Sequence, residues 1–157
     1  MTSQAELMDV VLDRWASPHF FTTAVSQQLP PGQTIHQVYQ IAPTLPSLQS
    51  QVRYAEYRVT VATERPAAEI TAALAALLAL EHLPWQHQRD TGPRHYDLRA
   101  LIDDLWLIDG AQPHCSLGMR LRCDNTGSGR PEQVAAALGF TTPPIAIHRT
   151  NLILETG

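Results

Sequence analysis

The segment Cys115–Cys123 constrains the fold of this chain more than any other feature. Apolar or thiol side chains occupy every second position of it, and polar residues, glycine or arginine lie between them. A period of two predicts a strand with one buried face and one open face. The glycine-rich turn Asn125–Gly129 follows directly, and Pro131 then predicts the first residue of a short helix that Gly139 ends. We therefore expect a strand, a tight turn and a helix in succession.

The rest of the chain shows similar strand and helix patterns, so we expect an α+β fold with a mixed or antiparallel sheet and helices packed on one face. Two ferredoxin-like-style modules are expected: an incomplete N-terminal β-α-β module at 1–45 and a β-α-β-β-β-β-α-β module at 46–157. The expected strands are 7–12, 34–41, 57–63, 85–89, 94–97, 105–108, 115–123 and 145–154, and the expected helices begin at Pro18, Pro66 and Pro131.

The composition excludes several classes of function. All 11 cations are arginine, so a Schiff-base lysine, a pyridoxal-phosphate lysine and a GxxxxGK[ST] phosphate loop are absent. The formal net charge of -4 argues against non-specific binding to nucleic acid. The longest apolar run, Ala72–Leu80, is too short to cross a bilayer, and no secretory signal is visible, so we expect a cytoplasmic protein that does not enter a membrane.

The two cysteines, Cys115 and Cys123, indicate neither a disulfide nor a metal centre. They lie on one strand with the parity of a buried face, which favours free thiols. His87 and His95 could face each other across a hairpin, but no third ligand accompanies them. We therefore expect no metal and no cofactor.

The best candidate site is the turn that contains Gly127, Gly129 and Arg130. Glycines let backbone amides approach a ligand, and a guanidinium binds phosphate through two parallel hydrogen bonds. A tight turn explains the same residues, if the glycines supply positive φ and Arg130 pairs with Asp124 or Glu132. Both interpretations stay open.

Other candidate residues surround this turn in the sequence. Asp97 and His148 are candidate catalytic acids or bases, although a structural role is the favoured explanation for each. Ion pairs or a solvated strand face likewise explain the other arginines. The candidate contacts to phosphate or RNA are Arg99, Arg120, Arg122, Gly127, Gly129, Arg130 and Arg149.

Several segments resemble a radical SAM-linked bacterial family of unknown function. They are HYDLRALIDDLWL, LGMRLRCDNTGSGRPEQVAAALG and IHRTNLIL, with AELMDVVLDR, LPPG and PSLQSQVRYAEYRVTV upstream. The resemblance implies a protein encoded beside, or fused to, a radical SAM enzyme, in some members near an RNase of the E/G type and ribosomal proteins. Members usually carry a further basic, helix-containing segment before the part that matches Ala5, so we expect a shortened member or a fragment. With two cysteines, this chain cannot supply the CxxxCxxC motif of the radical SAM cluster.

Three functions are consistent with these observations. The first is an accessory protein of a radical SAM enzyme that binds RNA or a nucleotide phosphate through the arginines. The second is an enzyme acting on RNA or a nucleotide, with Asp97 or His148 as acid or base and Arg130 beside them. The third is a protein-interaction domain, which could form a homo-oligomer through the exposed edge of the strand at 7–12.

Overall fold

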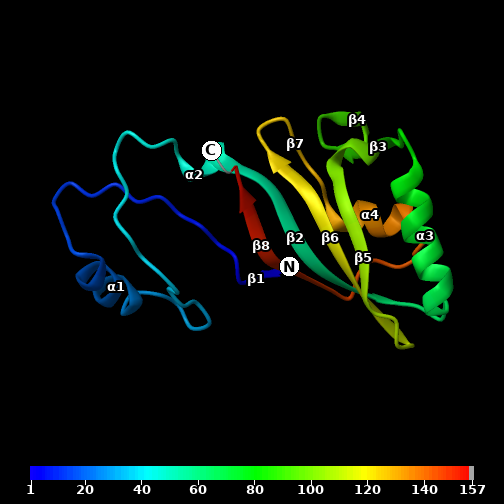
Figure 1. Cartoon of the computed structure of the whole chain (residues 1–157), viewed down its shortest axis with the longest axis horizontal. Helices are drawn as coiled ribbons and strands as arrows, with labels where there is room; N and C mark the ends of the chain where they lie inside the picture. Colours follow the sequence, from blue (N-terminus) through cyan, green and yellow to red (C-terminus); the bar gives the residue numbers. More distant parts are fainter. Residues whose placement is uncertain (156–157) are drawn as a thin grey trace. The chain divides into compact units, whose positions relative to one another are not determined.

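The computed structural model describes residues 1–155 and divides the chain into two compact units. Residues 1–7 join the chain from Leu48 onward in one unit, and Met8–Ser47 form the other. The elements in chain order (Figure 1) are β1 (Thr2–Ser3), α1 (Pro18–Ser26), α2 (Leu48–Gln51), β2 (Val52–Ala62), α3 (Ala67–Ala79), β3 (Pro84–Arg89), β4 (Gly92–Asp97), β5 (Ile102–Asp109), β6 (His114–Asp124), β7 (Gly127–Ser128), α4 (Pro131–Ala137) and β8 (Ala146–Leu154).

A six-stranded mixed sheet and a two-stranded hairpin form the larger unit. The sheet order is β1-β8-β2-β6-β5, with β7 paired to β6, and β3 pairs with β4 in the hairpin. Only the β1–β8 pair is parallel among the described strands. Along the chain, β2, α3, β5, β6, α4 and β8 follow one another in a β-α-β-β-α-β sequence, interrupted by the hairpin and by β7. The predicted α+β class is confirmed.

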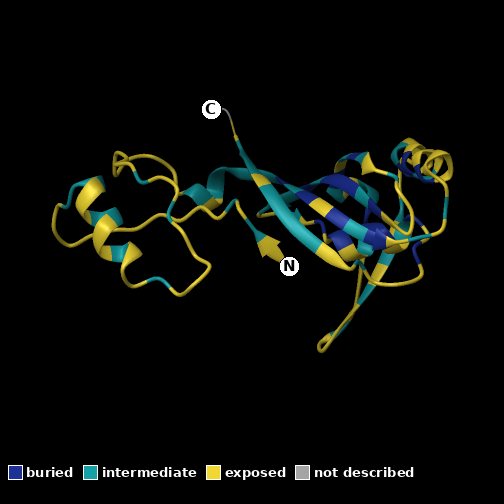
Figure 2. Ribbon diagram, turned by 90° about the horizontal axis from the view of Figure 1, so that it is seen from below, coloured by how far each residue is buried: buried dark blue, intermediate teal, exposed yellow. Residues whose placement is uncertain are grey.

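One face of the sheet carries the hydrophobic core. Alternate residues of β2 and β6 are buried, as the period of two predicts, and they join buried residues of α3 and α4 in one cluster. Figure 2 shows these buried positions concentrated on the strands and the facing helices. Among them, Val59, Leu117 and Met119 are completely buried. Cys115 is buried and Cys123 half-buried, and both are free thiols.

The helix expected from Pro66 forms as α3, with Ile70, Leu74 and Leu77 as its buried stripe. These positions repeat at intervals of three and four, which places them on one side of a helix. Burying each leucine rather than exposing it contributes about 2 kcal/mol. Helix α3 is therefore held on the sheet mainly by this stripe.

The N-terminal β-α-β module predicted for 1–45 does not form its strands. Residues 7–12 and 34–41 have no strand, because neither segment finds a neighbouring strand to pair its backbone. The predicted helix does form as α1, with the side chain of Ser17 accepting from the backbone N–H of Phe20 at 3.1 Å. No residue of Met8–Ser47 is buried.

Within residues 1–155, no helix is both long enough and apolar enough to cross a membrane.

Candidate functional site

The β3–β4 hairpin provides one wall of a surface pocket. Its register pairs His87 with Arg94 and Trp85 with Tyr96 across a two-residue connection. Residues opposite each other in an antiparallel pair share a face, as do residues two apart on one strand. Arg89 therefore lies on the same face as His87 and Arg94. The same register shows that the expected facing of His87 and His95 is wrong, because His95 pairs with Gln86 and points to the other face.

The glycine-rich turn provides the opposite wall, as a short strand folded back on β6. Cys123 pairs with Ser128 and Asp124 with Gly127. The Asp124 carboxylate accepts from the backbone N–H groups of Thr126 at 2.8 Å and Gly127 at 3.2 Å, and from the Thr126 hydroxyl at 2.6 Å. These bonds, led by the one from the Thr126 hydroxyl, lower the pKa of Asp124.

Neither glycine of this turn offers a free amide to a ligand. The N–H of Gly127 is bonded to Asp124, and that of Gly129 donates to the carbonyl of Arg122 at 2.8 Å. Neither has positive φ. A Cβ at Gly129 would lie 2.9 Å from Cβ of Leu121, so the residue is glycine because the strand passes close to its neighbours.

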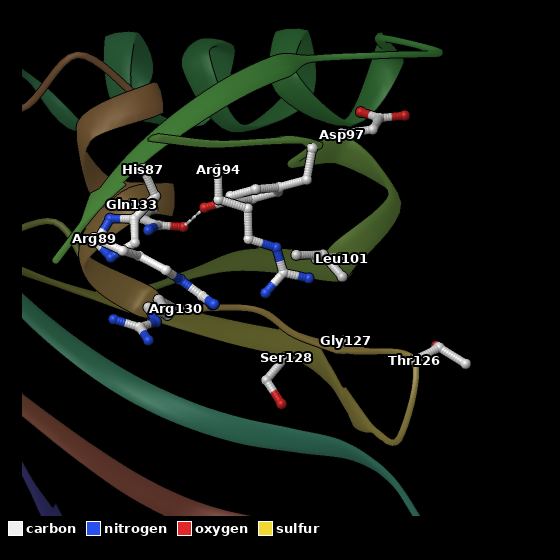
Figure 3. A pocket seen from close by; sticks show the side chains of 11 residues that line it. His87, Arg89, Arg94, Asp97, Leu101, Thr126, Gly127, Ser128, Arg130 and Gln133 are labelled. Carbon is white, nitrogen blue, oxygen red and sulfur yellow. Dashed lines mark hydrogen bonds between the residues drawn. The ribbon is translucent and has the colours of Figure 1, made fainter. Parts of the chain in front are cut away.

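A hydrogen bond joins the hairpin to α4, the helix that follows the glycine-rich turn. The Tyr96 hydroxyl on β4 donates to the side-chain oxygen Oε1 of Gln133 on α4; the dashed line that ends at Gln133 in Figure 3 marks this bond. The pocket has a volume of ≈ 100 Å³. Its lining residues are His87, Arg89, Arg94, Tyr96, Asp97, Leu101, Thr126, Gly127, Ser128, Arg130 and Gln133.

Three arginines give the pocket its positive charge. Arg89 comes from the end of β3, Arg94 from β4 and Arg130 from the residue before α4. Within residues 1–155, no carboxylate forms an ion pair with any of them. The Arg94 guanidinium lies over the Tyr96 ring, 5.8 Å from its centre. Burial raises the pKa of Tyr96, and the nearby positive charges of Arg130, Arg94 and Arg89 act against this rise.

Asp97 lines the same pocket, but its carboxylate is already engaged. It accepts from the backbone N–H of Leu83 at 2.8 Å, from that of Arg99 at 3.1 Å, and bonds with Nδ1 of His82 at 2.9 Å. The bond from Leu83, followed by that with His82, lowers the pKa of Asp97. In Figure 3 this carboxylate points away from the arginines. Asp97 thus connects the end of β4 to the residues just before β3 and just after β4.

The structure places His148 elsewhere. It lies on β8 beside β1, where Nδ1 is 2.6 Å from the Thr2 hydroxyl and Nε2 is 3.2 Å from the side-chain oxygen Oε1 of Gln4. His148 does not line the pocket that holds Asp97 and Arg130. The convergence of these three residues that the enzyme hypothesis requires is absent from the described structure.

The other predicted arginine contacts have partners of their own and do not line the pocket. Arg120 pairs with Glu56 at 2.8 Å and Asp103 at 3.4 Å, and the bond to Glu56 raises its pKa. Both carboxylates lie on strands that flank β6. The remaining pairs are Arg122 with Asp124 at 3.5 Å, Arg149 with Glu6, and Arg99 with the carbonyls of Ile102 at 2.7 Å and Leu78 at 3.0 Å.

Sequence reasoning found Arg130 and the turn, but it missed His87, Arg89 and Arg94. Alternation within 85–89 puts His87 and Arg89 on one face, and this pattern could have indicated half of the set. Placing Arg94 beside His87 requires the pairing register of β3 with β4, which the sequence alone does not show. In the described part of the chain, no group of three or more His, Cys, Asp or Glu residues is arranged to hold a metal ion.

Comparison with known proteins finds one family. Residues 1–131 match the family described as "Uncharacterized protein conserved in bacteria (DUF2344)". No curated protein and no solved structure matches the chain. The match ends at Pro131, the first residue of α4. It therefore includes the hairpin and the glycine-rich turn, but not Gln133, the pocket residue on α4.

Proposed function

This chain belongs to the DUF2344 family of uncharacterised bacterial proteins, and we propose that it is an accessory protein that binds a phosphate group of RNA or of a nucleotide. The observation that carries the proposal is the pocket in which Arg89, Arg94 and Arg130 meet without a carboxylate partner among residues 1–155. Guanidinium groups bind phosphate oxygens through paired hydrogen bonds, and arginine is favoured where planar recognition matters.

Fewer residues are available to contact phosphate than the sequence alone led us to expect. A ligand would have to compete with the carbonyls or carboxylates that are already bonded to, or ion-paired with, Arg99, Arg120, Arg122 and Arg149. The amides of Gly127 and Gly129 are likewise bonded within the chain. Side chains, not backbone amides, therefore form the phosphate contacts.

Salt dependence tests the proposal. For single-stranded nucleic acid, log affinity falls with log salt by about 0.7 per phosphate contact, so three contacts give a slope of about 2. The measurement is fluorescence anisotropy of a short labelled single-stranded RNA across a salt series. Absence of binding at low salt, or binding that ignores salt, would rule the proposal out.

Matched variants locate the contact. Arg94→Gln and Arg130→Gln each remove one pocket charge and should lower the slope by about 0.7. Arg58→Gln is the control, because Arg58 is exposed on β2, does not line the pocket and has no ion pair within residues 1–155. It removes the same charge and should leave the affinity and slope near the wild-type values.

The partner in this proposal is the radical SAM enzyme that the sequence resemblance implies. An observation in Met8–Ser47 supports a protein contact: Val11 is 96% exposed, Trp15 76% and Phe20 66%. Exposed apolar side chains in such number are typical of surfaces that bind another protein. Because residues 7–12 have no strand, the contact would use side chains instead of the strand edge expected from the sequence.

Co-purification with the radical SAM protein encoded beside this chain, before and after RNase treatment, tests this partner. Val11→Ser with Trp15→Ser should abolish co-purification, whereas Arg130→Gln should keep it. Loss of the complex on RNase treatment, or no complex with the wild-type chain, would contradict a direct protein contact. Light scattering of the chain alone would show whether a second copy is bound instead.

A further inference from the structure

The arginines of the larger unit fall into two groups by their partners. Six of them form ion pairs with carboxylates or donate to backbone carbonyls: Arg53, Arg65, Arg99, Arg120, Arg122 and Arg149. Within residues 1–155, the other four have neither kind of side-chain partner: Arg58, Arg89, Arg94 and Arg130. Three of these four line a single pocket. Since the other arginines of the unit are mostly paired, this concentration of unpaired ones marks the pocket as the place where an anion would find available guanidinium groups.

Among residues 1–155, the pocket lining contains three guanidinium groups and one carboxylate, that of Asp97, so positive charge is in excess there. The Asp97 carboxylate bonds with the backbone N–H groups of Leu83 and Arg99 and with the side chain of His82, and forms no ion pair with the three arginines. Figure 3 shows Arg89 and Arg94 reaching from the hairpin toward the strand that carries Ser128. Like charges held near one another repel, and an anion bound between them removes that repulsion.

The size of the pocket limits what can enter it. Its volume of ≈ 100 Å³ is well below the roughly 300–1,000 Å³ of pockets that enclose whole small molecules. A nucleobase and sugar therefore stay outside, while a group the size of one phosphate fits. Neutral polar side chains, including the exposed hydroxyl of Ser128, complete the lining.

We propose that the pocket takes a terminal phosphate monoester in preference to an internal phosphodiester, a specificity that rests on the proposed phosphate-binding function. A monoester carries about −1.5 to −2 charges at pH 7 and three acceptor oxygens. An internal diester carries one charge and has two unesterified oxygens. The guanidinium groups on the hairpin and at the start of α4 can contact all three free oxygens of a terminal phosphate. At an internal phosphodiester, the RNA strand continues on both sides of the phosphate, so two strand segments would have to leave the small pocket. The monoester comes either from an RNA end or from a free nucleoside monophosphate.

Two RNA probes and two competitors test this specificity on the intact chain. The probes are a short 3′-labelled single-stranded RNA with a 5′-phosphate and the same RNA with a 5′-hydroxyl. The competitors for the bound RNA are adenosine monophosphate and, as its control, adenosine. We expect the phosphorylated RNA to bind at least about tenfold more tightly than the hydroxyl form. Arg94→Gln and Arg130→Gln should remove this preference, and Arg58→Gln should retain it. Circular dichroism of each variant checks that the fold is kept.

The outcomes separate this inference from the proposed function. Equal binding of the two RNAs overturns the monoester preference and leaves phosphate binding in place. No binding of any probe overturns both. A preference that Arg58→Gln abolishes and the pocket variants keep also overturns the assignment to this pocket. Competition by adenosine monophosphate, but not by adenosine, supports the monoester and identifies a free nucleotide as a sufficient source. Failure to compete, with the RNA preference intact, identifies the RNA end.

Discussion

The hydroxyl of Tyr96 donates a hydrogen bond to the side-chain oxygen Oε1 of Gln133, and this bond connects the β3–β4 hairpin to α4. The hairpin pairs with no other strand among the described residues, so side-chain contacts must hold it in place. Trp85 and Tyr96, which share one face of the hairpin, pack against the hydrophobic core. The Asp97 carboxylate, at the end of β4, accepts hydrogen bonds from the backbone N–H groups of Leu83 and Arg99. Two of the three pocket arginines therefore depend on the hairpin being docked.

Tyr96→Phe removes this connection without changing the ring. We expect the free energy of unfolding to fall by about 0.5–1.5 kcal/mol, because the Gln133 oxygen is left without its donor. Phosphate affinity should fall as well, since the hairpin is less firmly held. Urea denaturation and anisotropy measure the two effects. Tyr39→Phe, at an exposed tyrosine, is the control, and equal stabilities of the Tyr96 and Tyr39 variants would contradict the prediction.

Gly129→Ala tests the close approach of the turn to the core. The added Cβ would lie 2.9 Å from Cβ of Leu121 and 3.1 Å from the carbonyl oxygen of Leu101, and neither atom belongs to a flexible side-chain end. We expect a loss of about 1–3 kcal/mol in the free energy of unfolding. Gly127→Ala is the matched control, because its Cβ meets only Cδ2 of Leu101, at 3.0 Å, which can rotate away. A Gly127→Ala loss as large as that of Gly129→Ala would refute this account of the turn.

The sequence predicted those parts of the fold in which one local pattern determines burial. Alternation in β2 and β6, and the apolar spacing of α3, indicate which side faces the core whatever the neighbour is. The strands predicted at 7–12 and 34–41 do not form, since a strand also needs a partner for its backbone. A single sequence does not show whether one is present.

The site was predicted in part for the same physical reason. Arg130 stands next to its turn in the sequence, so local reasoning reached it. Arg120 looked available to a ligand, yet the register of β2 with β6 places Glu56 opposite it. Arg94 was missed because its place beside His87 depends on the register of the hairpin. Both outcomes depend on contacts between strands, which the order of residues alone does not reveal.

Asp97 predicts a pH dependence of stability. Its pKa is lowered in the folded state, first by the hydrogen bond from Leu83 and then by His82, while desolvation acts in the opposite direction. A lowered folded pKa means that the unfolded chain binds the proton more readily. The contribution of Asp97 to stability is therefore complete above its unfolded pKa, about 3.9, and is lost as the pH falls through the folded value.

Asp97→Asn makes this dependence measurable. Its deficit in unfolding free energy relative to wild type should be largest near neutral pH and shrink as the solution is acidified below about pH 4. Urea denaturation across a pH series gives the deficit at each point. Asp90→Asn, in the exposed connection of the same hairpin, should show little deficit at any pH. A deficit for Asp97→Asn that grows toward acid would have the wrong sign for this mechanism.

Inorganic phosphate should stabilise the folded chain through the arginine pocket. An anion that binds the folded state alone raises the free energy of unfolding by RT ln(1 + [L]/Kd), which is about 2.7 kcal/mol at one hundred times Kd. Thermal unfolding in phosphate, compared with sodium chloride of equal ionic strength, isolates this binding from general screening. We expect a rise in Tm for the wild type and for Arg58→Gln.

The three pocket variants test where phosphate binds. Arg89, Arg94 and Arg130 are all exposed, so replacing one with glutamine should change the Tm without phosphate only slightly. The rise should be smaller for each of these three variants, because each removes one guanidinium that no carboxylate of the described chain neutralises. Equal rises in all the proteins would show that phosphate acts on the whole surface and not at this pocket.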